Sequence, residues 1–295
     1  MPKPIPAPRE EGFTTTTGSP IYWAKYGRVN APKLLVLHGG PGADHRYLLP
    51  QMLHLGEKHD LLFYDQRGGG RSKADARIPI TWETHVEDLG AVVEELGLDL
   101  LSIVGYSWGA MLGLLYAIEQ TGNPHLRAPD RMALISPAPL TREYRRQFEA
   151  EFTRRQQSPE IQRMREELAA SGLRERDMEA YRQRAFELGV AGYFSDPRKA
   201  KDLTPFRVVG RVQQSVWESL GDFNLISDLK GIKISTIIIT GRDDPIPFAS
   251  FSEGASALGT NLVVLDECGH VPYVEQPEKL FTALDPYLMN PLRPY

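Results

Sequence analysis

The stretch that decides the fold is Leu101-Ser-Ile-Val-Gly-Tyr-Ser-Trp-Gly-Ala-Met-Leu-Gly-Leu-Leu-Tyr-Ala117. Its first four residues are apolar or β-prone and predict a buried strand. From Ala110 onward, small and apolar residues predict a buried helix. Only five residues, Gly105 to Gly109, separate the two elements. The stretch therefore predicts a strand and a helix joined by a sharp turn with Ser107 at its centre.

This turn has the pattern Gly-x-Ser-x-Gly between a strand and a helix, which presents a serine hydroxyl clear of a sheet edge. The serine adopts a strained backbone there, and such strain persists only where the surroundings impose it. Gly105 and Gly109 lack a Cβ, so strand and helix can close against each other. The alternative is a buried turn with an inert serine.

Working outward from this turn, the chain alternates between short apolar strands and helices. A helix is predicted over 81–96, with Thr81 as its N-cap and Gly97 as its stop, and a last helix over 277–288. Strands that alternate with helices favour a mostly parallel, twisted sheet flanked by helices. The predicted strands are 33–37, 61–65, 101–104, 131–136, 234–240 and 261–265, preceded by a hairpin of 13–17 and 21–26.

The amino-acid composition changes after residue 139. From 141 to about 227 the chain is dense in Arg, Glu and Gln, and apolar residues recur at helical spacing. We expect solvated helix faces here rather than a binding role for the charges. This indicates three parts: a first core segment 1–139, a helical cap insertion 140–227 and a second core segment 228–295.

Composition excludes several classes of protein. A net charge of −4 gives no reason to expect nucleic acid or an anionic membrane as a partner. The single cysteine, Cys268, excludes an internal disulfide framework, and no apolar run is long enough to span a bilayer. The proline-rich start is not a signal peptide, so we expect a cytoplasmic protein. No metal-ligand or phosphate-loop spacing is present, and we expect neither metal nor cofactor.

A serine hydroxyl becomes a nucleophile when a histidine takes its proton and an acid fixes that histidine. On a fold with this turn, the partners follow in the order serine, acid, histidine. Past Ser107 the chain has two histidines, and His125 comes too early. His270, in a loop between the last strand and the last helix, is the predicted base. Asp243 and Asp244 both follow the strand 234–240, and Asp244 is the favoured acid while Asp243 stays open.

The negative charge that develops on the substrate needs two backbone N–H groups. One is expected from Trp108, which follows the serine. The other is expected from His38-Gly39-Gly40-Pro41-Gly42, after the strand 33–37. Gly39 permits close approach, Pro41 has no N–H, and Gly40 is therefore the predicted donor. A simple tight turn is the alternative for this loop.

Five motifs together resemble the proline iminopeptidase family of α/β-hydrolases. They are His38-Gly-Gly-Pro-Gly42, Asp65-Gln-Arg-Gly-Gly-Gly-Arg-Ser72, Ser107-Trp-Gly109, Gly241-Arg-Asp-Asp244 and Gly269-His270. The resemblance implies an α/β-hydrolase fold with a helical cap after the sixth strand and a Ser107–Asp244–His270 triad. It also implies release of an N-terminal residue, often proline, from short peptides through an acyl-enzyme. Asp65 and Arg67 are implied to tie loops together beneath the site.

The sequence departs from that family in two places. Family members that cleave N-terminal proline hold its amino group with cap glutamates, one just before a His-Tyr-Phe. Here the similar stretch, Gly189-Val-Ala-Gly-Tyr-Phe194, carries no carboxylate, and Glu187 and Glu218 are the possible substitutes. Tyr106 also replaces a usual glycine.

Three functions are therefore open. The first is an exopeptidase or small-peptide amidase resembling proline iminopeptidase. The second is an esterase or lactonase on the same fold, with the substrate a small peptide, amide or ester in either case. The third is a catalytically silent binding protein.

Overall fold

A computed structural model of the chain describes residues 4–75 and 77–290. Its centre is one eight-stranded sheet in the order β1-β2-β4-β3-β5-β6-β7-β8. The pairs β1–β2 and β2–β4 are antiparallel and all other pairs are parallel. The strands are β1 (Glu10–Phe13), β2 (Tyr22–Gly27), β3 (Lys33–Leu37), β4 (Asp60–Tyr64), β5 (Ser102–Tyr106), β6 (Arg131–Ile135), β7 (Ser235–Gly241) and β8 (Asn261–Leu265).

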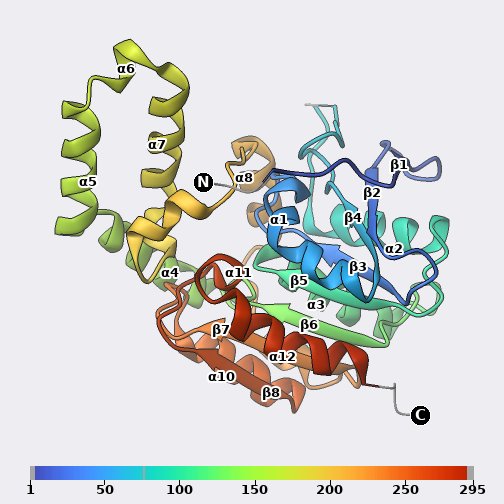
Figure 1. Cartoon of the computed structure of the whole chain (residues 1–295). Coiled ribbons are helices and arrows are strands. Elements are labelled where there is room, and N and C mark those ends of the chain that lie inside the picture. The colour runs from blue at the N-terminus through green and yellow to red at the C-terminus, as the bar shows by residue number, and fades with distance from the viewer. Residues whose placement is uncertain (1–3, 76, 291–295) are drawn as a thin grey trace.

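Helices cover both faces of this sheet (Figure 1). The α-helices are α1 (Leu49–Met52), α2 (Trp82–Glu95), α3 (Trp108–Gly122), α4 (Arg142–Gln156), α5 (Pro159–Ala170), α6 (Leu173–Arg176), α7 (Met178–Val190), α8 (Gly210–Ser219), α9 (Ile226–Leu229), α10 (Phe248–Leu258), α11 (Pro272–Glu275) and α12 (Pro277–Met289). The 3-10 helices are η1 (His45–Tyr47), η2 (Leu53–Glu57), η3 (Ala191–Tyr193) and η4 (Pro197–Asp202). The predicted mostly parallel sheet flanked by helices is confirmed.

The apolar strands feed two cores, one on each face of the sheet. In β3, Leu35 and Leu37 pack into the core beneath α2 and α3, while Leu34 and Val36 pack into the core beneath α1 and α12. Successive side chains of a strand point to opposite faces. A strand covered on both faces therefore needs an unbroken apolar run, as residues 33–37 have.

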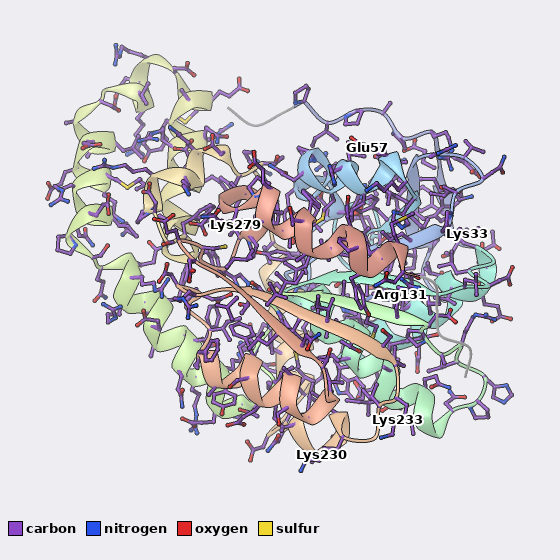
Figure 2. The ribbon with its side chains drawn as sticks, turned by 60° about the horizontal axis from the view of Figure 1, so that its bottom comes forward. Lys33, Glu57, Arg131, Lys230, Lys233 and Lys279 are labelled. Carbon is purple, nitrogen blue, oxygen red and sulfur yellow. The ribbon has the colours of Figure 1, made fainter. Side chains whose placement is uncertain are left out.

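Arg131, labelled in Figure 2, ties the last helix to the sheet. Its guanidinium donates to the backbone oxygens of Tyr287 and Leu288, each at 2.7 Å, and to that of Asn290 at 2.7 Å. These carbonyls at the end of α12 have no partner within the helix. A buried cation at the start of β6 thus caps the C-terminal end of α12.

One predicted strand is wrong. The sequence predicts a strand over 13–17, but β1 ends at Phe13. The carboxylate of Glu95, at the end of α2, accepts hydrogen bonds from the backbone N–H and the hydroxyl of both Thr15 and Thr16. A side chain distant in sequence therefore takes the donors that a strand would have used.

The chain leaves the sheet after β6 and returns to it before β7, and the outgoing and returning stretches lie side by side. Thr141 and Asn224 form an isolated antiparallel bridge, and Arg142 N–H donates to Phe223 O at 2.9 Å. We call residues 141–224 the inserted segment. Its described residues form helices, 3-10 turns and loops apart from that bridge, and α5, α6 and α7 project beyond the sheet (Figure 1). The domain limits 140 and 227 stay a prediction.

Candidate active site

Ser107 sits at the turn between β5 and α3 with φ 52° and ψ −117°. A non-glycine residue with positive φ is strained and persists only where its surroundings fix it. Here the Ser107 N–H donates to Ile135 O at 2.9 Å, and Ser107 O accepts from Ala138 N at 3.0 Å. Bonds to β6 and the loop after it thus impose the strained backbone.

Glycines leave the room that this turn needs. A Cβ on Gly105 would lie 2.5 Å from the Ala110 Cα, and one on Gly109 would lie 2.3 Å from Leu37 O. A Cβ on Gly39 would lie 2.9 Å from the Ser107 Cβ. The three glycines therefore let β3, β5 and α3 converge around the serine.

Two loops bring the other predicted residues to Ser107. The His270 Nε2 lies 2.9 Å from the Ser107 Oγ, and the His270 Nδ1 lies 2.9 Å from Asp244 Oδ2. The Asp244 carboxylate also accepts the Ile246 N–H at 2.9 Å. Because that carboxylate accepts, Nδ1 carries the proton and Nε2 is free to accept from the hydroxyl. The structure brings together Ser107, His270 and Asp244 in one hydrogen-bonded line.

Asp243 points elsewhere. Its carboxylate accepts the Ser195 hydroxyl at 2.8 Å, and its backbone oxygen accepts from Arg155 at 2.6 Å. Both contacts lie on the inserted segment, so of the two adjacent acids Asp244 is the one in contact with His270. His125 is exposed in the loop after α3.

Gly40 and Trp108 line the same cavity as Ser107 and His270. Trp108 is the first residue of α3, where a backbone N–H has no partner within the helix. Among the hydrogen bonds of the described residues, none is donated by the Gly40 or the Trp108 N–H. Gly40 has φ 64°, a conformation that glycine adopts readily.

The cavity beside Ser107 measures about 130 Å³. A cavity of roughly 150 Å³ holds a benzene molecule, so there is room for one small group. Its wall is mostly aromatic and aliphatic, and the inserted segment supplies much of it. The lining residues from that segment are Phe148, Val190, Tyr193, Leu203, Phe206, Val208, Gln213 and Trp217.

The charge of this cavity follows from its wall. None of the described residues that line it is Asp, Glu, Lys or Arg. Burial raises the pKa of Tyr193 to about 12, so its hydroxyl is neutral at physiological pH. The polar groups of the wall are therefore hydroxyls, one amide, the indole N–H groups of Trp108 and Trp217, His270 and backbone groups.

Glu187 and Glu218, the two acids considered as substitutes for the family's amine-binding glutamates, are not among the residues that line the cavity. Glu187 is buried against Arg184 and Gln183 of its own helix, α7. Glu218, on α8, accepts from Gln214 at 2.7 Å and lines a separate surface pocket with Arg142.

Tyr47 supports the glycine loop and carries no motif that sequence reasoning recognises. Its hydroxyl accepts the Gly39 N–H at 2.8 Å, which fixes the peptide just before Gly40. The tyrosine is buried in η1, and burial raises its pKa. Its position could be found only once the fold brought η1 under the loop.

Asp65 and Arg67 tie loops together, as the resemblance implies. The Asp65 carboxylate accepts from the His45 ring at 2.7 Å and from the Arg71 N–H at 2.7 Å. Burial alone would raise the pKa of Asp65, but the His45 hydrogen bond and nearby charge hold it below its usual value. Arg67 pairs with Asp88 of α2.

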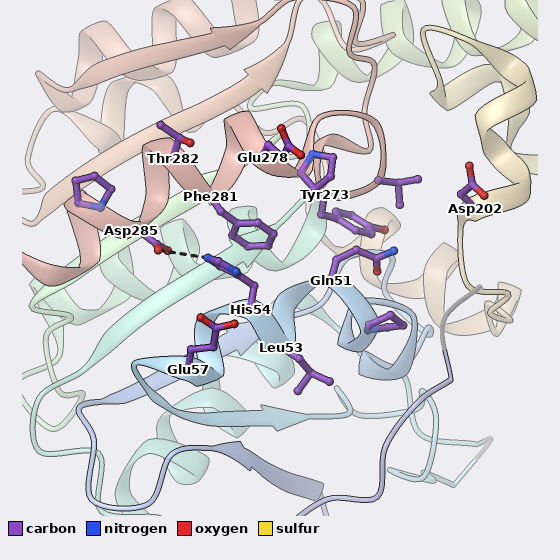
Figure 3. Close-up of a pocket in the computed structure, with 14 residues that line it drawn as sticks. Gln51, Leu53, His54, Glu57, Asp202, Tyr273, Glu278, Phe281, Thr282 and Asp285 are labelled. Carbon is purple, nitrogen blue, oxygen red and sulfur yellow. Dashed lines mark hydrogen bonds and ion pairs between the residues drawn. The ribbon is translucent and has the colours of Figure 1, made fainter. Parts of the chain in front are cut away.

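A larger groove of about 1060 Å³ lies between η2 and α12, away from Ser107 (Figure 3). Asp285, which lines it, contacts His54 at 3.3 Å and Lys58 at 2.7 Å. It shares one lining residue, Tyr273, with the smaller cavity. Figure 3 shows acidic side chains along this groove, with no group of three ligands arranged for a metal among the described residues.

The chain belongs to the α/β hydrolase family, whose model matches residues 34–283. Among curated relatives, a proline iminopeptidase of Lactobacillus delbrueckii subsp. lactis is 26% identical over 91% of this chain and 95% of its own. That of Thermoplasma volcanium is 37% identical, but the aligned part is 45% of each chain.

Solved structures share the fold. A proline iminopeptidase-related protein from Thermus thermophilus aligns over 95% of this chain and 96% of its own, with a TM-score of 0.70 and 22% identity. An enol-lactonase from Burkholderia xenovorans aligns over 95% of this chain and all of its own, with a TM-score of 0.64 and 20% identity. None of the described helices of this chain has the length and apolar character needed to cross a bilayer.

Proposed function

We propose that this hydrolase works through an acyl-enzyme on Ser107. His270 takes the hydroxyl proton as the serine oxygen bonds to the acyl carbon, and Asp244 holds the imidazole and stabilises its positive charge. The observation that carries the proposal is the unbroken line from Ser107 Oγ through His270 to Asp244, with both links at 2.9 Å. The N–H groups of Gly40 and Trp108 receive the oxyanion.

The remaining steps need only water. The bond to the leaving oxygen or nitrogen breaks as His270 returns the proton to it. Water then attacks the ester on Ser107, His270 takes a proton from that water, and the acid departs as the proton goes back to the serine.

The cavity wall favours a compact, uncharged, apolar acyl group, in an ester or an amide. A substrate with a free N-terminal amine would bring an ammonium group into a cavity whose described wall has no carboxylate. A buried charge without a partner is costly. The inserted segment would then act as the cap that selects the acyl group.

Release of an N-terminal residue is the second candidate, because the curated relatives named above are proline iminopeptidases. The two candidates differ in one chemical group, the amine next to the scissile carbonyl.

A matched pair of substrates separates them. Cyclopentanecarboxylic acid 4-nitroanilide has the ring of proline 4-nitroanilide without its amine, and the corresponding 4-nitrophenyl esters give a second pair. We expect higher kcat/KM for the cyclopentane compounds. Faster turnover of the proline compounds would overturn this preference and favour the aminopeptidase.

The nucleophile is tested separately. A fluorophosphonate probe should label wild type at Ser107, and Ser107→Ala should lose labelling and about 10⁶-fold in kcat. An unlabelled wild type without turnover would instead support the silent binding protein.

A further inference from the structure

The loop that carries His270 is tied to the inserted segment by one buried acid. Glu275, in α11, is 6% exposed. One of its oxygens accepts the Gly269 N–H at 2.6 Å, and the other accepts the Ser195 N–H at 2.9 Å. Gly269 directly precedes His270, so the carboxylate joins the histidine loop to a turn of the inserted segment.

A second contact reinforces this junction. The His270 N–H donates to Tyr193 O at 2.7 Å, and the two rings lie 5.4 Å apart. A Cβ on Gly269 would lie 2.2 Å from Tyr193 O, so the backbones are in direct contact. The peptide groups on either side of Gly269 are thus both held by hydrogen bonds, one to Glu275 and one to Tyr193.

We infer that Glu275 is a positioning residue, which holds His270 at its distance from Ser107 by fixing Gly269 against Ser195. The inference rests on the proposed acyl-enzyme mechanism. It requires a carboxylate, because the donors that converge here, from Gly269, Ser195 and Asp196 (3.4 Å), all need acceptors. An amide presents one acceptor and one donor, and its N–H₂ would face a backbone N–H.

The surroundings of Glu275 make this role dependent on pH. Burial raises the pKa of Glu275 to about 7, although the three N–H donors and Lys199 oppose the shift. Lys199 and Asp196 approach from the inserted segment, and Cys268 approaches from the loop after β8. The Cys268 thiol in turn lies near Asp243 and Asp244. Protonation of Glu275 turns an acceptor oxygen into a donor that faces an N–H, so the junction weakens as pH falls.

The central variant is Glu275→Gln, with Glu278→Gln as its matched control. Glu278 is an exposed acid at the start of α12, labelled in Figure 3, and the control removes the same charge three residues away. We expect Glu275→Gln to lower kcat for a 4-nitrophenyl ester 10- to 100-fold with KM within twofold, and Glu278→Gln to leave both unchanged. Circular dichroism and thermal unfolding establish that each variant is folded.

The pH profile of wild type is a second readout and needs no variant. Turnover requires a neutral His270, and protonation of Glu275 should lower kcat further, by the 10- to 100-fold expected for Glu275→Gln. Log kcat should therefore fall by more than one unit per pH unit within the acid limb, and Glu275→Gln should fall by no more than one.

These outcomes distinguish a failure of the positioning role of Glu275 from a failure of the proposed function. If wild type hydrolyses the ester and is labelled at Ser107, but a folded Glu275→Gln keeps full kcat, the positioning role is overturned. If Glu275→Gln does not fold, a folded Glu275→Asp with full kcat overturns it equally, because the shorter acid cannot hold both Gly269 and Ser195 at these distances. Failure of wild type to label or to turn over contradicts the proposed function itself.

Discussion

At the scale of single residues, two adjacent carboxylates have different partners. Asp244 contacts the His270 ring and Asp243 contacts Ser195, although both follow β7. The sequence favours Asp244 but leaves Asp243 open, because the choice depends on how the turn after Gly241 aims each side chain.

The pair gives a sharp test. Asp244→Asn should lower kcat by about 10⁴-fold, since an amide at this place favours the wrong imidazole tautomer. Asp243→Asn changes the neighbouring side chain alone and should keep kcat within about tenfold. Steady-state ester hydrolysis measures both. Equal losses in the two variants would contradict the assignment of Asp244 to His270.

At the scale of helices and strands, the sequence predicts those bounds and caps that depend on neighbouring residues. The strands 33–37 and 261–265 are found at their predicted bounds. Thr81 caps α2 in a capping box with Thr84, and Gly97 beyond its end has φ 59°. These features depend on residues within a few positions of each other, so a short stretch of sequence contains everything needed to predict them.

Features that depend on distant partners could not be predicted. Glu95 accepts from Thr15 and Thr16 of the strand expected over 13–17, and Glu275 accepts from Ser195, 80 positions away in the sequence. Neither acid belongs to a motif. The short elements η1, α1 and η2 also carry too little periodicity to be recognised.

The close packing of α3 against β3 predicts that an added methyl group at Gly109 destabilises the protein. Gly109→Ala would place a Cβ 2.3 Å from Leu37 O and should destabilise the protein by about 1–3 kcal/mol or more. Gly122→Ala, in the same helix, has no atom within 4 Å of its Cβ and should be neutral or stabilising by up to about 1 kcal/mol. Urea unfolding midpoints compare the two, and similar values would contradict the packing argument.

At the scale of the whole molecule, buried titratable groups give stability a pH dependence with opposing contributions. Burial lowers the pKa of His85 to about 4 and also lowers the pKa of His38 and of His59. Unfolded histidine takes up a proton near pH 6.5, so each contributes stability that is lost as pH falls below that value. Glu275, with its pKa raised to about 7, contributes in the opposite direction.

His85 can be isolated from the others by difference. Its Nε2 donates to Arg67 O at 3.2 Å, a bond that the amide of His85→Gln can keep without titrating. Between pH 7.5 and 4.5, wild type should lose on the order of 2 kcal/mol more unfolding free energy than the variant. Urea titrations at the two pH values measure this difference, and parallel losses would show that His85 is not held neutral by the fold.

The bridge between Thr141 and Asn224 affects how the inserted segment can vary among related hydrolases. Because the segment leaves and rejoins the core side by side, its projecting helices α5, α6 and α7 can change in length without moving the ends of β6 and β7. Eight of the residues around the cavity belong to that segment, whereas Ser107, Asp244 and His270 do not. If that segment selects the acyl group, as proposed, grafting it between relatives should transplant the preference, provided that the graft keeps the backbone contacts of Tyr193 and Ser195 to His270 and Glu275.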